Sequence, residues 1–368
     1  MSAANSGLGP VTIVVCNYDG VLHLPPCLDA LAALRGEVAE VIVVDDASTD
    51  ASLELLRARY PGVRVIARER NEGPAAARNA GMRAAATRWV LAVDNDAVLA
   101  PDVLELLCAA AAREPAAVLV QPRSVLDGEP GRVHYDGGSF HYAGLIALRN
   151  FYRPLEQAAG AGAREVDCAV SVALLADRER VLELGGYDER YFILFEDLDL
   201  SFRLRARGWK VLSVAEALVR HRAGTEGLSY REGPHYPRRR AFYHSRNRWR
   251  FLVKCYRPWT LVCAAPGLVL YEVAWLAFAL AGGNLGAWCA GKWAFLRELP
   301  DVLRRRADFQ RARRLSDGAL LSGGPLTVTP SLARGAARAS ALRLLDAGLR
   351  AWWSLARRLV PRGSSEDP

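Results

Sequence analysis

Three carboxylates lie within four positions of one another in the segment YFILFEDLDLSFRLRARGWK, residues 191–210. From Glu196 onward, apolar residues recur at helical spacing on two opposite sides, which predicts a buried helix. Burying Glu196, Asp197 and Asp199 is costly unless each meets a partner, a metal ion or the N-terminus of the helix. A carboxylate that stays ionised and is partly shielded from water can take the proton of an attacking alcohol. A carboxylate of this segment is therefore a candidate general base, and the alternative is that these carboxylates only cap the helix.

A second acidic group follows the apolar run WVLAV, residues 89–93. Asp94 and Asp96 flank Asn95, and two carboxylates at one strand end suit a hard divalent cation such as Mg²⁺ or Mn²⁺, which in turn would carry a diphosphate. The alternative is an ordinary turn rich in Asp and Asn. His221, in the segment VRH, suits a third ligand position, although a single histidine is more often a surface residue or a hydrogen-bonded core residue.

Strands and helices that alternate along the first part of the chain must position these residues. Short, β-branched apolar runs predict strands at 11–16, 41–44, 63–67, 89–93 and 118–122. The segments between them have helical composition, at 24–35, 49–60, 74–87 and 100–113. This alternation predicts an α/β fold, a doubly wound and mostly parallel sheet. Ligands of such sheets bind beyond the carboxyl ends of the strands, where the motifs NYDG (17–20) and DDASTD (45–50) stand.

Other common kinds of site find little support in the sequence. Asp45 alone would suit the ribose of a nicotinamide cofactor, but the first turn is CNYDG, without the glycines of G-x-G-x-x-G. The seven cysteines are scattered without a CxxC pair, which argues against both a disulfide framework and a zinc site. The N-terminal residues MSAANSGLGP lack the basic and apolar regions of a signal peptide, so none is expected.

The formal net charge of +8 conceals a partition between two parts of the chain. Residues 1–225 carry 24 Lys and Arg against 30 Asp and Glu, whereas residues 226–368 carry 24 against 10. The basic part also contains an apolar run, 258–283, with Glu272 near its middle and arginines on both flanks. Its length suits a bilayer, and it predicts a bent helix or hairpin in one leaflet of an anionic membrane, or a single span. A basic amphipathic helix is expected at 333–360.

Two other interpretations of residues 226–368 remain. They form a helical subdomain that packs on the rest of the chain, or they bind nucleic acid. The second is disfavoured, because the arginines flank an apolar run and lack the interleaved, exposed aromatic residues of a strand-binding groove. No nucleic acid partner is therefore expected, and self-association into a homo-oligomer stays open.

Six segments, in their order and spacing, resemble the motif series of family 2 glycosyltransferases, particularly the bacterial rhamnosyltransferase-like branch. They are VTIVVCNYDG, VIVVDDASTD, NEGPAAARNAG, WVLAVDND, GGYDERYFILFEDLDLSFRLRARGW and VRH. The resemblance covers roughly residues 10–225 and continues more weakly, through YHSRNRWRFLVK (243–254), to about residue 315. It implies a GT-A fold (Rossmann-like), a nucleotide-sugar donor and inversion at the anomeric carbon.

The resemblance also implies roles for individual residues. Asp94 and Asp96 match the metal-binding DxD motif, and His221 matches a histidine found at the metal ion, Mg²⁺ or Mn²⁺. Asp197 matches the general base, with Glu196 beside it as a further catalytic candidate. The remaining matches would hold the nucleotide-sugar donor: Cys16, Asn17, Tyr18, Asp45, Asp46, Asn79 and Asp94.

Two departures affect the acceptor side of the resemblance. In VDCAVSVALL, Cys168 stands where the family usually has Trp and Val172 where it usually has Gly, so the acceptor is not identified. The segment SRNRW (245–249) half-resembles the Q-x-x-R-W of processive synthases, with Ser245 in the Gln position. Because those enzymes have several membrane spans and this chain has at most one, we expect the addition of one or a few sugars.

The sequence as a whole predicts an inverting, metal-dependent glycosyltransferase at the cytoplasmic face of the plasma membrane. A catalytic domain, 1–225, would move a sugar from a nucleoside-diphosphate donor to a hydroxyl of a polyprenyl-linked glycan acceptor in cell-envelope polysaccharide or glycolipid synthesis. A basic helical region, 226–368, would bind the anionic membrane surface, peripherally or by a single pass. The alternative is a nucleotide-sugar-binding protein that keeps the fold and lacks activity. Donor choice depends on pocket shape, so the sugar is not predicted.

Overall fold

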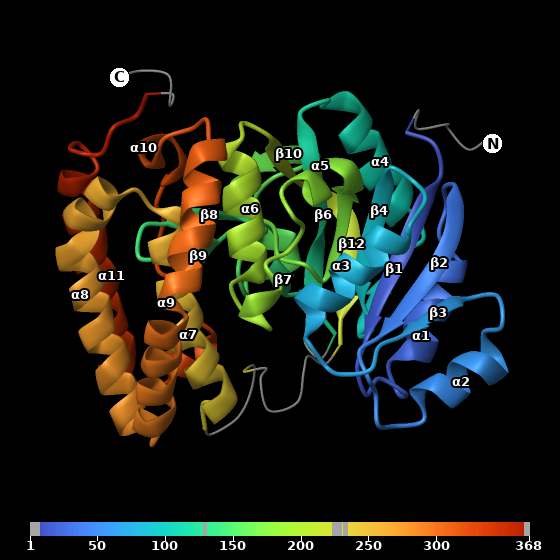
Figure 1. Cartoon of the computed structure of the whole chain (residues 1–368), viewed down its shortest axis with the longest axis horizontal. Coiled ribbons are helices and arrows are strands. Elements are labelled where there is room, and N and C mark those ends of the chain that lie inside the picture. The colour runs from blue at the N-terminus through green and yellow to red at the C-terminus, as the bar shows by residue number, and fades with distance from the viewer. Residues whose placement is uncertain (1–7, 128–130, 223–229, 231–234, 364–368) are drawn as a thin grey trace. The chain divides into compact units, whose positions relative to one another are not determined.

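The computed structural model describes residues 8–127, 131–222, 230 and 235–363 (Figure 1). These residues form two compact units. The first takes in the described residues up to Gly137, then Arg149–Leu204 and the stretch from Trp209 to Arg222. The second takes in Gly138–Leu148, Arg205–Gly208 and the described residues from 230 onward. The expected boundary between residues 225 and 226 lies outside the described residues.

A ten-stranded mixed sheet forms the centre of the first unit, in the order β10-β12-β6-β11-β4-β1-β2-β3, with β5 on β12 and β7 on β6. Its strands are β1 (Val11–Asn17), β2 (Val38–Asp45), β3 (Arg64–Ala67), β4 (Trp89–Asp94), β5 (Ala97–Leu99), β6 (Ala117–Leu126), β7 (Val133–Tyr135), β10 (Ala163–Val166), β11 (Ala173–Asp177) and β12 (Lys210–His221). Strands β1 to β4 run parallel, as do β6 and β12, and β11 runs antiparallel between β4 and β6.

Helices cover both faces of this sheet (Figure 1). They are α1 (Leu24–Ala32), α2 (Ser52–Arg59), α3 (Pro74–Ala84), α4 (Val103–Arg113), α5 (Arg178–Glu183) and α6 (Glu196–Ala206), with short 3₁₀ turns at Leu155–Gln157 and Glu189–Tyr191. Alternate residues of β1 serve opposite faces: Ile13 and Val15 pack in the core with α1, α2 and α4, whereas Val14 packs with α3, α5 and α6. The doubly wound α/β architecture is confirmed.

The predicted strands and helices are found within a few residues of their expected bounds. The carboxylate helix is shorter than the helical spacing of its apolar residues indicates: this spacing continues to Trp209, but α6 ends at Ala206. Gly208 follows with φ +87°, a left-handed conformation that terminates helices. The stretch 123–165, which the sequence left uninterpreted, contains β7 to β10.

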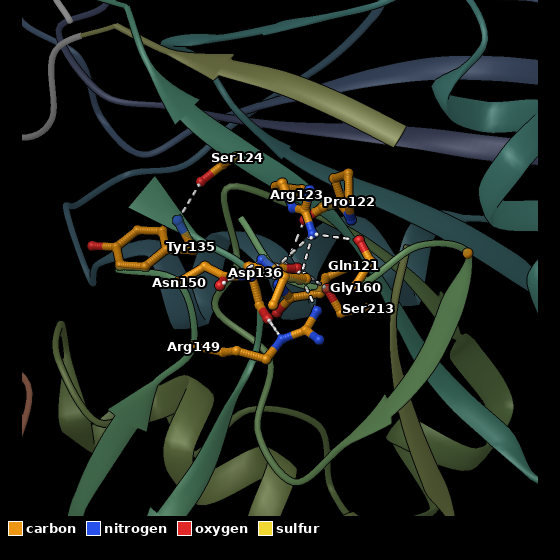
Figure 2. A network of polar contacts seen from close by, with 12 residues as sticks. Gln121, Pro122, Arg123, Ser124, Tyr135, Asp136, Arg149, Asn150, Gly160 and Ser213 are labelled. Carbon is orange, nitrogen blue, oxygen red and sulfur yellow. Dashed lines mark hydrogen bonds and ion pairs between the residues drawn. The ribbon is translucent and has the colours of Figure 1, made fainter. Parts of the chain in front are cut away.

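A buried carboxylate, Asp136, holds the end of β7 against the centre of the sheet (Figure 2). It accepts hydrogen bonds from Arg123 on β6, from Ser213 on β12, and from Arg149 and Asn150, which lie between Leu148 and the 3₁₀ turn at Leu155–Gln157. Two guanidinium groups and two neutral donors thus satisfy this buried carboxylate with hydrogen bonds. The network therefore fixes β7, β6 and β12 relative to one another.

The second unit is helical. Its elements are α7 (Arg238–Cys255), α8 (Pro258–Ala281), α9 (Leu285–Ala312), α10 (Asp317–Leu320) and α11 (Ala336–Ala356), a 3₁₀ turn at Pro330–Ala333, and the hairpin β8 (Gly138–His141) and β9 (Leu145–Leu148). Helix α7 packs along α9, and α11 packs along α8. Within the described residues, α8 alone is long and apolar enough to cross a membrane.

Glu272, in the middle of α8, has four partners within the second unit. Its carboxylate lies 2.8 Å from Arg248 on α7 and 2.6 Å from Lys292 on α9. The indoles of Trp249 and Trp288 donate to it at 2.9 and 3.1 Å. The SRNRW segment therefore supplies two of these four partners, and its arginine and tryptophan bind a carboxylate of the same unit.

Candidate functional site

The pairing of β2, β1 and β4 brings the predicted acidic motifs to one edge of the sheet. Asn17 at the end of β1 is the register partner of Asp45 at the end of β2, and Cys16 is the partner of Asp94 at the end of β4. Asn95 then donates from its amide nitrogen to Asn17 Oδ1 at 2.8 Å. These strand ends therefore form a continuous polar rim, as expected at the carboxyl edge of a parallel sheet.

Asp45, at one end of this rim, is fully buried and fully hydrogen-bonded. Asn17 Nδ2 donates to it at 2.7 Å, and Ser48 donates through both its hydroxyl, at 2.7 Å, and its backbone N–H, at 2.9 Å. The carboxylate closes the turn that follows β2. Its direct interactions are with this loop and with Asn17 of β1, and a contact with the nucleotide-sugar donor stays a prediction.

Asp46 binds the segment that precedes α3. It accepts from Arg68 at 2.6 Å and from the backbone N–H groups of Glu72 and Gly73 at 3.1 and 2.7 Å. Gly73 has φ +87°, and an added Cβ would lie 2.4 Å from the carbonyl oxygen of Phe192. Only glycine combines this conformation with so close an approach, so Asp46 and Gly73 together hold the 192–195 loop in place.

The other predicted donor-binding residues differ in exposure. Tyr18 is exposed and offers its ring to a ligand, whereas Cys16 is buried and burial raises the pKa of its thiol to about 12. Asn79, on α3, is fully buried and exchanges hydrogen bonds with both backbone groups of Tyr187. Its amide nitrogen also donates to Glu189 at 2.8 Å. Asn79 thus ties α3 to the chain that leads into the carboxylate helix.

Asp94, Asp96 and His221 come together, with one potential ligand atom of each within 4.8 Å of the others. The antiparallel pairing of β12 with β5 sets His221 opposite Ala97, so that His221 Nε2 lies 3.3 Å from Asp96 Oδ2. Burial raises the pKa of Asp94 to about 6, against the lowering effect of Arg78 and with a further raising effect of Asp96. Two carboxylates and one imidazole suit Mg²⁺ or Mn²⁺, whose charge would offset this crowding of negative groups.

Arg78, on α3, connects the metal candidates to the carboxylate helix, and sequence reasoning missed it. Its guanidinium is buried, lies 2.7 Å from Asp94 and 3.8 Å from Glu196, and donates to the carbonyl oxygen of Ser171 at 3.0 Å. Among the described residues, its Nε and the Oε2 atom of Glu196 are buried without a hydrogen-bond partner. Buried polar atoms in native proteins are rarely unsatisfied, so water or a ligand is expected to complete these two.

The two carboxylates at the start of α6 have different surroundings. Asp197 is half-buried and accepts the backbone N–H of Ser171 at 2.9 Å together with the Ser171 hydroxyl. Glu196 is buried, and burial raises its pKa to about 8, with the charge of Asp197 adding to the shift and Arg78 opposing it. Glu196 therefore keeps its proton near neutral pH, while Asp197 accepts two hydrogen bonds from Ser171.

Asp199, the third carboxylate of the segment, has a structural role. It is fully buried, accepts from Arg203 Nε at 2.7 Å and accepts from the Tyr191 hydroxyl at 3.1 Å. Arg203 also donates to the carbonyl oxygens of Leu184 and Gly186. Asp199 thereby fastens the helix to the turn before it.

The loop that leads into α6 is strained. Phe192 has φ +63° and ψ −69°, and the N–H of Ile193 donates to the carbonyl of Tyr191, which makes a γ-turn of the rare left-handed type. Leu194 and Phe195 follow with φ of +67° and +75°. Backbone strain of this kind persists where the surrounding structure enforces it, and it is concentrated at functional sites. Here it immediately precedes Glu196 and Asp197.

Comparison with models of known protein families identifies the family of this chain. The model of Glycosyl transferase family 2 matches residues 12–164, and the model of Glycosyl transferase family group 2 matches residues 89–299, more than half of the chain. The chain belongs to the family 2 glycosyltransferases. The resemblance stated from the sequence motifs is confirmed.

Curated relatives of this family 2 glycosyltransferase align over different lengths. It is 39% identical over 126 residues to the succinoglycan biosynthesis protein ExoO of Rhizobium meliloti (strain 1021), covering 33% of this chain and 36% of that protein. It is 28% identical over 233 residues to the N-acetylglucosaminyl-diphospho-decaprenol L-rhamnosyltransferase of Mycobacterium tuberculosis (strain ATCC 25618 / H37Rv), covering 57% of this chain and 75% of that protein.

A solved structure of GalNAc-T7 with UDP, GalNAc and Mn²⁺ has a similar fold, with a TM-score of 0.55 and 18% sequence identity. The match covers 71% of this family 2 glycosyltransferase and 51% of the GalNAc-T7 chain. At this identity the likeness shows the fold, and the predicted GT-A fold is confirmed.

Proposed function

We propose that this family 2 glycosyltransferase moves a sugar, with inversion, from a nucleoside-diphosphate donor to a hydroxyl group of a glycan acceptor, with the help of Mg²⁺ or Mn²⁺. The observation that carries the proposal is the chain of contacts through Arg78. Arg78 contacts Asp94 at the metal candidates and the Ser171 carbonyl, and the same Ser171 donates twice to Asp197. These contacts connect the proposed cation site to the proposed base, which supports a role of both in one reaction.

The proposed chemistry is a single displacement. The acceptor oxygen attacks the anomeric carbon from the side opposite the diphosphate, the bond to the diphosphate breaks, and Asp197 receives the hydroxyl proton. A bound divalent cation would offset the charge that develops on the leaving diphosphate. Asp197 keeps unused acceptor capacity, because each carboxylate oxygen can accept two hydrogen bonds and Ser171 supplies one to each. Glu196, which holds its own proton near neutral pH, is a neighbour rather than the base.

The proposal is tested with a pair of isosteric variants. Asp197→Asn is expected to lower kcat about 10²-fold or more, because the amide cannot accept the proton, while nucleotide binding stays near wild type. Glu196→Gln, the matched neighbour, is expected to keep kcat within about tenfold. The donor is first found by thermal-shift screening of nucleoside diphosphates with Mn²⁺, and turnover is followed as release of the nucleoside diphosphate. Equal turnover in wild type and Asp197→Asn removes Asp197 from the mechanism.

The acceptor is proposed to be lipid-linked, because the second unit presents a surface suited to lipid. Every exposed position of α8 is apolar, over a length of about 36 Å at 1.5 Å per residue. The exposed positions at the start of α9, from Leu285 to Leu296, are apolar as well. We call these the apolar hairpin face: Pro258, Trp259, Val262, Ala265, Pro266, Val269, Leu270, Val273, Ala277, Leu280 and Ala281 on α8, with Leu285, Gly286, Cys289, Ala290, Trp293 and Leu296 on α9.

Two features favour an anionic membrane surface as the occupant of the apolar hairpin face. The first is its size, since soluble monomers rarely expose so long an unbroken apolar surface. The second is the charge that follows it on α9, where Arg297 and Arg304 are exposed, and on α11, where Arg350 is exposed. Apolar insertion together with basic residues near anionic headgroups gives attachment that salt weakens only in part.

The partners of Glu272 favour a helix that lies in one leaflet over a helix that spans. A spanning α8 would expose its whole circumference to lipid, and Glu272 would then lose Arg248 and Lys292. With those partners kept, one side of α8 is bound to α7 and α9 while the opposite side is free to meet acyl chains. We propose that this membrane surface is the cytoplasmic one, where nucleotide-sugar donors are made. The acceptor is proposed to be a polyprenyl-linked glycan, because the mycobacterial relative is named for a decaprenol-linked substrate.

Membrane binding is tested by sedimentation of the full-length protein with anionic vesicles. The wild type is expected to sediment at low salt and to be released only in part at high salt. Val262→Asp with Val269→Asp, both on the apolar hairpin face, is expected to stay in the supernatant. Leu22→Asp, at an exposed leucine of the first unit, is the control and is expected to sediment. Wild-type protein that stays in the supernatant would contradict the membrane proposal and leave the sugar transfer untouched.

A further inference from the structure

His134, on β7, faces the metal-binding candidate His221. It is buried, and its Nδ1 atom lies 3.0 Å from Nδ1 of His221, a hydrogen-bond distance. On the other side of the His221 ring, Nε2 lies 3.3 Å from Asp96. No sequence pattern singles out His134, because this residue stands in the stretch 123–165, which shows no clear periodicity.

A β-bulge turns His134 toward this position. In the pairing of β7 with β6, Val133 is opposite Val125 and Tyr135 is opposite Ser124, so His134 is the extra residue between two successive pairs. Bulges of this kind re-aim a side chain and recur beside active sites. The Asp136 network anchors the strand two residues further on, and the backbone N–H of Tyr135 donates to the Ser124 hydroxyl (Figure 2). The ring of His134 stacks on Tyr135, with centroids 3.8 Å apart.

The contact between two Nδ1 atoms constrains both rings. A hydrogen bond between them requires that one nitrogen carry the hydrogen and the other offer its lone pair. A histidine that binds a metal ion through Nε2 must carry its hydrogen on Nδ1, and that N–H is usually donated to a partner that orients the ring. In His221, the Nδ1 hydrogen would point at His134. His134 would then accept through Nδ1 and carry its own hydrogen on Nε2.

We propose that His134 is a positioning residue, which fixes the ring orientation and the tautomer of His221 so that Nε2 of His221 is available to a divalent cation. The proposal rests on the metal site of the proposed function. It differs from that function in assigning a role to a residue outside the sequence motifs. The alternative hypothesis is a packing role, in which His134 only fills space beside Tyr135.

Two substitutions separate the acceptor from the ring. His134→Asn places Oδ1 at the same number of bonds from the backbone as Nδ1, so it keeps an acceptor and loses the stacked ring. His134→Phe keeps a stacked ring and loses the acceptor. Binding of Mn²⁺ alone to the full-length protein is measured by electron paramagnetic resonance of the free ion and by calorimetry, with thermal melts to confirm folding. The Phe variant is expected to bind about 10- to 100-fold more weakly than wild type, and the Asn variant within about threefold.

A packing role predicts the reverse order, since Phe preserves the stacking on Tyr135 and Asn does not. Equal losses in the two variants, a larger loss in Asn, or wild-type affinity in Phe each overturn the proposal. A second measurement needs no substitution and covers the case of a variant that does not fold. In the wild-type protein with Mg²⁺, ¹⁵N spectra of the six histidines are expected to show His221 with its hydrogen on Nδ1 and His134 with its hydrogen on Nε2. A His221 hydrogen on Nε2 in the loaded protein overturns the proposal.

Failure of this role and failure of the metal site give different results. If wild-type protein binds Mn²⁺ and the Phe variant binds it equally well, the positioning role falls and the metal site stands. If wild-type protein binds no Mn²⁺, the metal site falls, and the positioning role falls with it.

Discussion

Two acidic pairs stand on the same rim of the sheet, and their surroundings are opposite. Asp45 and Asp46, after β2, are saturated by donors from their own loop and from the segment before α3. Asp94 and Asp96, after β4, crowd each other and His221, and the pKa of Asp94 is raised to about 6. The first pair has the surroundings of a structural element, and the second has those of a site that gains from a cation.

The difference lies in the donors that each motif brings with it. DDASTD supplies Ser48 three residues after Asp45, in the geometry of a turn that satisfies its own carboxylate. DND supplies only Asn95, whose amide nitrogen donates to Asn17. Two motifs that look alike in composition therefore differ in their surroundings. The hydrogen-bonded pair holds the rim in shape, and the crowded pair is the candidate cation site. Three sets of variants test this difference.

The largest effect is expected from neutralising the crowded pair. Asp94→Asn combined with Asp96→Asn should abolish the thermal stabilisation that Mn²⁺ and a nucleoside diphosphate confer together, because the cation loses both carboxylates. The melting temperature of the ligand-free variant is the reference for that stabilisation, because Asp94 also lies 2.7 Å from the buried guanidinium of Arg78 and its loss changes the stability of the protein without ligand. The matched change at the saturated pair, Asp45→Asn, should do the reverse, costing about 1–3 kcal/mol of stability while Mn²⁺ still binds. If chelation by EDTA leaves the wild-type enzyme fully active, the assignment of the crowded pair is wrong.

A smaller effect is expected at the glycine that donates to the saturated pair. Gly73→Ala should destabilise the protein by about 2–4 kcal/mol, because alanine is strained at φ +87° and its Cβ would meet the Phe192 carbonyl. Gly185→Ala is the matched control, since Gly185 has φ +81° with open space around it. That control isolates the strain, so it should cost about 1 kcal/mol. Equal chemical denaturation midpoints for the two variants would show that the 192–195 loop does not press on Gly73.

The smallest effect concerns the pH dependence of stability at Glu196. Its pKa is raised from 4.5 to about 8 in the folded state, so the folded protein holds a proton that the unfolded chain releases. Stability contributed by this group therefore falls as pH rises from about 4.5 through about 8. Glu196→Gln removes that fall, and its melting temperature relative to wild type should be nearly unchanged at pH 5 and higher by a few degrees at pH 8.5. A constant difference across this range would contradict the buried, protonated state of Glu196.

Local sequence patterns predicted most of the fold and the acidic candidates. Short apolar runs and the helical segments between them are visible as an alternation in the first 122 residues, and motifs such as DND come directly at a strand end. Arg78, Ser171 and His134 were missed for a different reason. Each acquires its role from a partner far away in the chain, through the approach of α3 to the carboxylate helix or through a bulge in β7. The spacing of residues within a single segment cannot predict those contacts.

The same limit applies to α8. Its length and composition predicted a membrane segment with an unfavourable charge at Glu272. In the structure, Arg248 of α7 and Lys292 of α9 form ion pairs with Glu272. A charge that is unfavourable in a spanning helix therefore binds one side of α8 to its neighbouring helices. Neither partner is recognisable before the helices are packed.

The distribution of thiols has a practical consequence. All seven cysteines lie in the described residues, six are buried, and the exposed one is Cys289, within the apolar hairpin face. A maleimide dye would therefore label the native protein at one point, without any substitution, and its emission would report directly whether that face enters a bilayer. The same thiol would also join two molecules through a disulfide in air-oxidised preparations. A dimer seen without reducing agent would then be a product of storage, and assembly of this protein must be measured with its thiols kept reduced.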